Sequence, residues 1–186
     1  MRVIFTNIFC EKIFIICCLF TFSCSSNEAI KEQICELKST MINIPLGQME
    51  LIAGTYPPDV LTPYKLIVYA DSTECSSCYS KKLYLWDKMI NTYSSVSFIY
   101  IFDNLSNDDI DAINHLSIPT NMYVYLDKNR YFSSTNIHIP SNRDMHIFCL
   151  DSTNNVVAVG NPLKSLALKE LYDSALKSVK KQINVR

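Results

Sequence analysis

Nearly continuous runs of apolar residues alternate along the chain with segments in which apolar positions recur every three or four residues. The runs 64–70, 96–102 and 121–127 are typical of strands that are buried on both faces of a parallel sheet. The segments 76–92 and 106–116 between them have apolar residues at helical spacing, which places Leu83, Trp86 and Ile90 on one face of the first helix. Ser106, with Asp109 three residues on, predicts a capping box at the start of the second helix. This order predicts an α/β fold in which helices flank a central sheet.

The last third of the chain has a different pattern. The apolar runs 145–151 and 156–160 are separated by a short polar turn, which predicts a β-hairpin. We expect residues 128–144 to be irregular, and we expect a final helix that begins at Pro162 and ends in a basic tail. With the hairpin added, the prediction is a mixed sheet of about five strands.

The stretch from Glu74 to Cys78 stands where the first predicted strand gives way to a helix, and it contains a Cys-x-x-Cys pair. A helix N-terminus favours a thiolate and lowers a cysteine pKa from about 8.5 into the range of roughly 3.5–7.5. A second cysteine one turn on can attack a mixed disulfide formed by the first. The pattern therefore predicts thiol–disulfide exchange at Cys75 and Cys78.

Other roles for this cysteine pair are also open. It could form a disulfide with only a structural role. Zinc is disfavoured because the sequence shows no second Cys-x-x-Cys and no histidine pair. Attachment of c-type haem needs a histidine after the second cysteine, where Tyr79 stands. We therefore predict no metal and no cofactor.

The N-terminal segment has the pattern of an export signal. Arg2 and Lys12 precede an apolar run of 10 residues, 13–22, which is too short to cross a bilayer of roughly 30 Å as a helix. Its length suits the apolar region of a signal peptide, and we predict one over residues 1–23. An uncleaved membrane anchor is the alternative.

The segment Leu19–Cys24 resembles the lipobox of bacterial lipoproteins, in which a small residue precedes the cysteine that becomes lipidated. This resemblance implies lipidation at Cys24, and a plain secretory signal is the alternative. We expect residues 24–40 to form a tether and a short helix, and residues 41–186 to form one domain. The predicted location is the cell envelope, facing the periplasm or on the surface, outside the reducing cytoplasm.

Charge and composition exclude some partners. The formal net charge is −1, from 17 basic and 18 acidic residues without a block of one sign, so we predict no nucleic-acid partner. The chain has only 3 glycines, which argues against a glycine-rich phosphate loop. Among its 8 cysteines, Cys149 lies in an apolar strand and is expected to be buried, and pairing of Cys35 with Cys149 stays undecided.

Over about residues 40–180 the chain resembles the TlpA/ResA-like group of the thioredoxin fold. The resemblance rests on the strand, Cys-x-x-Cys and helix in sequence, on the strand at 122–127, and on the two strands of the C-terminal hairpin. It implies exchange with the thiols or disulfides of exported proteins. Carried over, Cys75 is the attacking thiol and Cys78 is the resolving thiol. From their positions at the start of the helix, we expect Cys75 to be exposed and Cys78 to be turned into the helix.

The chain departs from this family beside the cysteines. Glu74 and Ser77 replace the tryptophan and proline that are usual there, and Met145 stands at the position of the family's cis-proline, preceded by Asp144. A cis peptide before a residue other than proline costs about 2.5–4 kcal/mol, so we expect Met145 to be trans. Glu74, Asp144 and Met145 are thus the candidate residues of the substrate groove.

Two consequences for function follow from these departures. Negative charge on Glu74 and Asp144 would oppose a thiolate at Cys75. His146, next to Met145, is expected to be a surface or hydrogen-bonded strand histidine, with an approach to the disulfide as the alternative. Two functions therefore stay open: a lipid-anchored thiol–disulfide oxidoreductase, and a redox-inert thioredoxin-like module that binds a partner or has a structural role.

Overall fold

The computed structural model describes four ranges of the chain: 28–54, 63–75, 77–78 and 81–183. The chain divides into two compact units, residues 1–36 and residues 37–186. In the first unit, residues 28–36 are helical. The predicted signal peptide over 1–23 and the predicted lipidation site at Cys24 lie outside the described residues. No described helix is long and apolar enough to cross a membrane.

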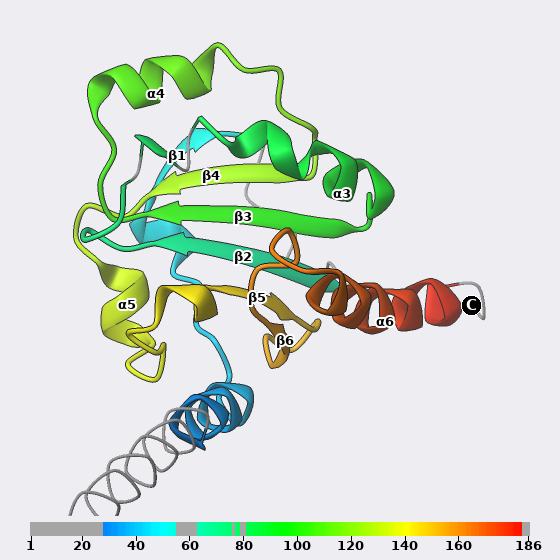
Figure 1. Ribbon diagram of the computed structural model, residues 1–186. Helices are drawn as coiled ribbons and strands as arrows, with labels where there is room; N and C mark the ends of the chain where they lie inside the picture. The colour runs from blue at the N-terminus through cyan, green and yellow to red at the C-terminus, as the bar shows by residue number, and fades with distance from the viewer. Residues whose placement is uncertain (1–27, 55–62, 76, 79–80, 184–186) are drawn as a thin grey trace, which may run out of the picture. The chain divides into compact units, whose positions relative to one another are not determined.

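The second unit is built on a sheet of six strands (Figure 1). The strands are β1 (Glu50–Ala53), β2 (Tyr64–Ala70), β3 (Val96–Phe102), β4 (Met122–Leu126), β5 (Ile147–Leu150) and β6 (Val156–Val159). Their order across the sheet is β1-β4-β3-β2-β5-β6. β2, β3 and β4 are parallel neighbours, whereas β1, β5 and β6 pair antiparallel. The predicted mixed sheet is confirmed, with β1 as an additional edge strand.

The continuous apolar runs form the centre of this sheet. All seven residues of β3 are buried, and so are six of the seven in β2. The two strands are in parallel register from Tyr64 opposite Val96 to Ala70 opposite Phe102. Both strands therefore end at the same edge of the sheet, and the loops that follow them lie side by side there.

Helices cover both faces of the sheet. The helical elements are η1 (Leu46–Gln48), η2 (Leu83–Trp86), α3 (Asp87–Thr92), α4 (Asn107–Asn114), α5 (Tyr131–Thr135), η3 (Arg143–Met145) and α6 (Leu166–Ile183), where η marks a 3-10 helix. Leu66 and Val68 share a core cluster with Trp86 of η2 and Tyr172 of α6. On the opposite face, the ring of Tyr69 lies 5.1 Å from that of Phe132 in α5, between centroids.

Four predicted element boundaries were wrong. The final helix, α6, begins at Leu166 rather than at Pro162, which lies in a turn before it. The helix expected over 76–92 is interrupted, because the chain forms a 3-10 turn at η2 before α3 begins at Asp87. The region 128–144 contains α5 and most of η3 rather than only irregular chain. The fourth predicted strand begins at Ile147, since Met145 belongs to η3 and His146 caps it.

Candidate functional site

The cysteine pair lies in the loop that follows β2, at the carboxyl edge of the parallel strands. Cys75 and Cys78 form a disulfide with their Cα atoms 5.2 Å apart. The N–H of Cys78 donates to the carbonyl oxygen of Cys75 at 2.9 Å, which closes the turn. Both cysteines are exposed, so the expectation that Cys78 turns into the helix was wrong.

The helix whose dipole was expected to act on these cysteines is interrupted before η2. Ser77 and Cys78 are helical, and the N–H of Lys81 donates to the carbonyl of Ser77 at 3.3 Å. The chain then passes through η2, and α3 begins only at Asp87. Because the macrodipole grows with the number of aligned peptides, one turn gives little stabilisation to a thiolate at Cys75.

Ser77, between the two cysteines, connects the disulfide turn to α4. Its hydroxyl donates to Oδ2 of Asp109 at 2.7 Å. The same carboxylate oxygen accepts the hydroxyl of Ser106 at 2.6 Å, and the N–H of Asp109 donates back to Ser106. This is the capping box that the sequence predicts at Ser106. Asp109 therefore holds both the start of α4 and the turn that carries the cysteines.

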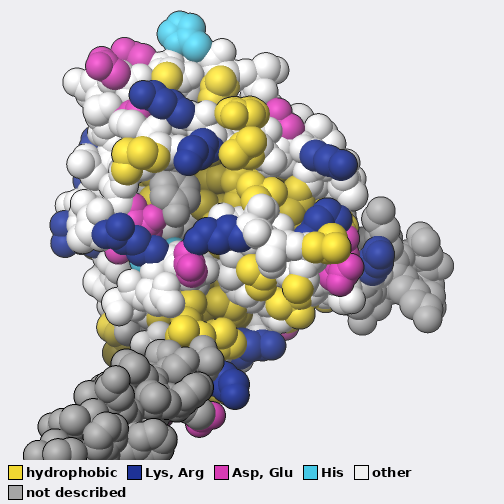
Figure 2. All heavy atoms as spheres, viewed as in Figure 1, with side chains coloured by type: hydrophobic (Ala, Val, Ile, Leu, Met, Phe, Trp, Pro, Cys, Tyr) yellow, Lys and Arg dark blue, Asp and Glu magenta, His cyan; other side chains and the backbone are white. Residues whose placement is uncertain are grey.

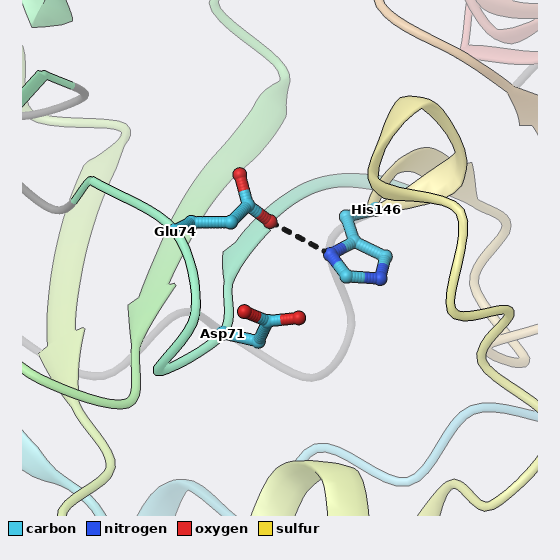
Figure 3. Close-up of side chains that lie close together, drawn as sticks. All are labelled: Asp71, Glu74 and His146. Carbon is cyan, nitrogen blue, oxygen red and sulfur yellow. Dashed lines mark hydrogen bonds and ion pairs between the residues drawn. The ribbon is translucent and has the colours of Figure 1, made fainter.

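On the other side of the disulfide turn, Glu74 forms a buried ion pair with His146 (Figure 3). Nδ1 of His146 lies 2.9 Å from Oε1 of Glu74, and the two side chains are only 3% and 4% exposed. Nε2 of His146 lies 2.8 Å from the carbonyl oxygen of Pro140. Since a carbonyl only accepts, Nε2 carries a proton, and donation from Nδ1 to Glu74 then makes the ring an imidazolium.

The charge of this imidazolium agrees with the shift in the pKa of His146. Burial, the largest single effect, lowers the pKa of His146. The hydrogen bond with Glu74, the carbonyl of Pro140 and the negative charges of Glu74 and Asp71 act in the opposite direction, and the net pKa is raised. His146 is thus the hydrogen-bonded histidine that the sequence favoured, although it lies buried before β5 rather than in a strand.

A second link joins the same two loops. Nη2 of Arg143 donates to the carbonyl oxygen of Thr73 at 3.0 Å and to its hydroxyl oxygen at 2.6 Å. We name the two links, Arg143–Thr73 and His146–Glu74, the loop clamp. The clamp holds residues 140–146 against the loop that leads into Cys75.

Met145, at the position where the resemblance places a cis-proline, lies within this clamped segment. It is 4% exposed, and its N–H donates to the carbonyl of Asn142 at 2.9 Å. No described residue takes part in a cis peptide bond, so the peptide before Met145 is trans, as expected. At the position that the resemblance assigns to the family's cis-proline, this chain therefore has a buried methionine in a 3-10 turn.

The two acidic residues predicted beside the cysteines each have a cationic partner. Glu74 is paired with His146, and the exposed Asp144 forms an ion pair with Nζ of Lys164. Their charge therefore acts less strongly on a thiolate at Cys75 than the sequence suggested. The pairing of Glu74 with His146, 72 positions apart, has no signal in a single sequence.

The donor atoms of Asp71, Glu74 and His146 all lie within 4.8 Å of one another, and a histidine with two carboxylates is a donor set that divalent cations accept (Figure 3). Here each donor already has a partner. Asp71 accepts hydrogen bonds from the N–H and the hydroxyl of Thr73 at 2.7 and 2.6 Å. Burial, the largest single effect, raises the pKa of Asp71, but the hydrogen bonds from Thr73 and the charges of His146 and Arg143 lower it, and the net pKa is lowered. Two cations thus face two carboxylates, and we interpret the cluster as an ion-pair network.

The two other cysteines in the described part of the chain, Cys35 and Cys149, do not join the disulfide pair. Cys149 is free and buried in β5, where burial, the largest effect, raises its pKa to about 12. Cys35 is free and exposed. A Cys35–Cys149 disulfide, which the sequence left undecided, is absent from this structure, and Cys149 is poorly reactive as a thiolate.

Three parallel strands, an antiparallel hairpin and a Cys-x-x-Cys pair directly after the central strand β2 together define a thioredoxin-like fold, as the sequence predicts.

No protein-family model and no curated protein matches this chain. Among solved structures, it is similar to copper-bound yeast Sco1, with 13% identity over 71% of this chain and 89% of the other, at a TM-score of 0.46. It is also similar to the thioredoxin domain of a thiol-disulfide oxidoreductase from Bacteroides vulgatus, with 14% identity, 63% and 82% coverage and a TM-score of 0.42. A third similar structure is the bacterioferritin comigratory protein of Xanthomonas campestris, with 13% identity over 76% of this chain and 96% of the other, at a TM-score of 0.43. At such low similarity, function has to be inferred from the site itself.

Proposed function

We propose that the protein is a lipid-anchored thiol–disulfide oxidoreductase that exchanges disulfides with exported proteins outside the cytoplasm. The observation that carries this proposal is the exposed Cys75–Cys78 disulfide at the carboxyl edge of β2. Exposed disulfides are the labile and catalytic ones, because a thiolate can reach their sulfur atoms.

A purely structural role explains this disulfide less well. In the chain-entropy model, the stabilisation from a disulfide grows with the length of the loop that it closes. Cys75 and Cys78 are separated by 3 positions, so their loop is short and its closure contributes only about 2 kcal/mol. The turn is also held by the Ser77–Asp109 hydrogen bond. The disulfide is therefore better suited to exchange than to stabilisation.

The proposed exchange is balanced in atoms and electrons. In the reduced protein, the thiolate of Cys75 attacks one sulfur of a substrate disulfide and releases one substrate thiolate, which takes up a proton. The thiolate of Cys78 then attacks Cys75 in the mixed disulfide and releases the second substrate thiolate. The protein dithiol becomes the disulfide seen here, and the substrate disulfide becomes a dithiol. A second dithiol compound reverses these steps and restores the protein.

This proposal is tested by single-turnover exchange with insulin as a disulfide substrate. The reduced full-length protein, freed from reductant, is mixed with insulin, and mass spectrometry follows the Cys75–Cys78 fragment and the insulin chains. We expect one insulin disulfide to be reduced for each Cys75–Cys78 disulfide formed. Cys75→Ser should abolish the reaction, and Cys35→Ser is the matched control. Equal rates for the parent and Cys75→Ser would refute the proposal.

The anchor is a separate part of the proposal, supported by Ser23-Cys24 directly after a short apolar run. A single acyl chain binds membranes weakly, so stable anchoring needs more than one. We expect Cys24→Ser to move the processed protein from the membrane fraction to the soluble fraction. If the processed variant stays with the membranes, Cys24 is not the anchor.

One observation favours the second candidate, a redox-inert thioredoxin-like module. Met145 is buried in a 3-10 turn at the place where the family has its cis-proline, so a substrate backbone loses that pairing site. In the insulin experiment, an inert module would leave the insulin disulfides intact in the parent as well as in Cys75→Ser.

A further inference from the structure

A cavity of about 420 Å³ opens beside the disulfide turn, between that turn, η2 and α4. Its apolar wall is formed by Tyr84, Ala112, Ile113 and Leu116. Ser77, the residue between the two cysteines, lines the same cavity. The cavity therefore adjoins the place where the proposed exchange occurs.

The apolar wall is accessible from solvent. Tyr84 is 65% exposed and Leu116 is 46% exposed, whereas Ile113 at the base is buried. Figure 2 shows hydrophobic side chains at the surface over the upper part of the molecule, where α4 and α3 lie in Figure 1. Covering such side chains with an apolar group is favourable by about 25 cal/mol for each Å² removed from water.

Charged residues at the rim suit a peptide rather than a wholly apolar ligand. Lys81 lines one side of the cavity, and Asp108, in the first turn of α4, lines the other. A peptide backbone and polar side chains can lie across such a rim while one apolar side chain enters. The Ser77–Asp109 hydrogen bond fixes the cysteine turn relative to α4, so the cavity keeps its place beside the disulfide.

The opposite side of the disulfide turn is fastened by two links. There the loop clamp joins Arg143 to Thr73 and His146 to Glu74, and Met145, in the same segment, is buried. A buried ion pair holds the turn on that side, and separating its charges is costly. On the α4 side the cavity is already open.

We propose that this cavity binds an apolar side chain next to the reacting cysteine of the substrate protein. The inference rests on the proposed exchange function and names the class of segment that it favours: a cysteine flanked by leucine-like residues. As the apolar side chain enters the cavity, the substrate disulfide is placed at Cys75. The Cys75 thiolate then forms the mixed disulfide and releases the other sulfur as a thiolate.

The test measures mixed-disulfide formation in the full-length Cys78→Ser protein, in which the adduct at Cys75 persists. Three probes are compared: an aryl-disulfide-activated peptide with leucines beside its cysteine, the same peptide with asparagines there, and 2-hydroxyethyl disulfide. Mass spectrometry of the Cys75 fragment gives each rate. We expect the leucine peptide to react roughly tenfold faster than the asparagine peptide, the factor that corresponds to burial of about two methylene groups.

Two variants address the cavity, in addition to Cys78→Ser. The double substitution Tyr84→Ala with Leu116→Ala removes its exposed wall, and Ala112→Trp fills it. Both act at exposed positions, so the fold should be kept. Leu166→Ala, at a position 70% exposed on α6, is the matched control. We expect the rate ratio to fall to about one in both cavity variants and to stay near ten in the control.

Three outcomes overturn the inference. The first is a ratio of leucine-peptide rate to asparagine-peptide rate near one in the parent. The second is an unchanged ratio in both cavity variants. The third is a change from dimer to monomer in those variants, which would mean that a second copy of the chain occupies the cavity. If 2-hydroxyethyl disulfide itself does not react at Cys75, the exchange function fails and the inference fails with it. A reactive small disulfide without peptide preference refutes the inference alone.

Discussion

The two sides of the disulfide turn differ in how they are held and in what they leave open. Towards residues 140–146 the turn is fastened by a buried ion pair and by Arg143, and Met145 of that segment is buried. Towards α4 it is fastened by one hydrogen bond from Ser77 to Asp109, and a cavity opens there. The clamped side therefore contributes mainly to stability, and we propose that the open side contributes mainly to recognition.

The largest effect is expected from His146→Ala on the clamped side. It leaves the Glu74 carboxylate, whose side chain is 4% exposed, without its cationic partner. Removing one member of a buried ion pair costs about 3–5 kcal/mol. Urea unfolding should show a loss of that size. A loss below about 1 kcal/mol would mean that the pair is solvated and that the two sides do not differ as we describe.

A smaller effect is expected from Asp109→Ala on the open side. It removes the acceptor for Ser77 and the capping box of α4, with an expected loss of about 1–2 kcal/mol in unfolding free energy. Asp108→Ala, one residue earlier and exposed, should cost only about 0.5 kcal/mol through the helix dipole. Equal losses in the two variants would show that Asp109 does not hold the turn.

The clamp also makes stability depend on pH. The folded-state pKa of His146 is raised above its usual value of about 6.5, so the folded protein binds this proton more tightly than the unfolded chain. The stabilisation is complete below about pH 6.5 and is lost as the pH rises through the folded pKa. The difference in unfolding free energy between the parent and His146→Gln should shrink over this range. A difference that is constant or grows with pH would contradict the imidazolium.

The smallest effect is expected at Asp144. Its ion pair with Lys164 is solvent-exposed, with side chains 66% and 56% accessible, and such pairs contribute about 0.5 kcal/mol or less. Asp144→Asn should therefore lower the unfolding free energy by about 0.5 kcal/mol or less and leave the rate of the insulin reaction within about twofold of the parent. A marked increase in the rate of exchange would show that the charge of Asp144 acts on Cys75 after all.

Apolar patterning predicted the sheet because it depends on which residues are buried, and burial extends over whole strands. It also placed Leu83, Trp86 and Ile90 in the core correctly, although the helix that carries them is interrupted. Apolar spacing reports the face that a segment buries and does not distinguish a 3-10 turn followed by an α-helix from a continuous α-helix.

The site was predictable where its chemistry is local in the sequence. The Cys75–Cys78 spacing gave the disulfide, and the Ser106–Asp109 spacing gave the capping box. The clamp was not predictable, because the pairing of Glu74 with His146 depends on how two distant loops meet at the sheet edge. The cavity beside Ser77 depends in the same way on the distance between α4 and η2.

The most direct test of the central claim, that Cys75 and Cys78 exchange disulfides, is the reduction potential of this pair. The full-length protein is equilibrated in glutathione and dithiothreitol buffers, and alkylation with mass spectrometry gives the oxidised fraction of the Cys75–Cys78 fragment. We predict a potential between about −270 and −120 mV, the range of exchange proteins. A value below about −300 mV, as structural disulfides have, would contradict the claim.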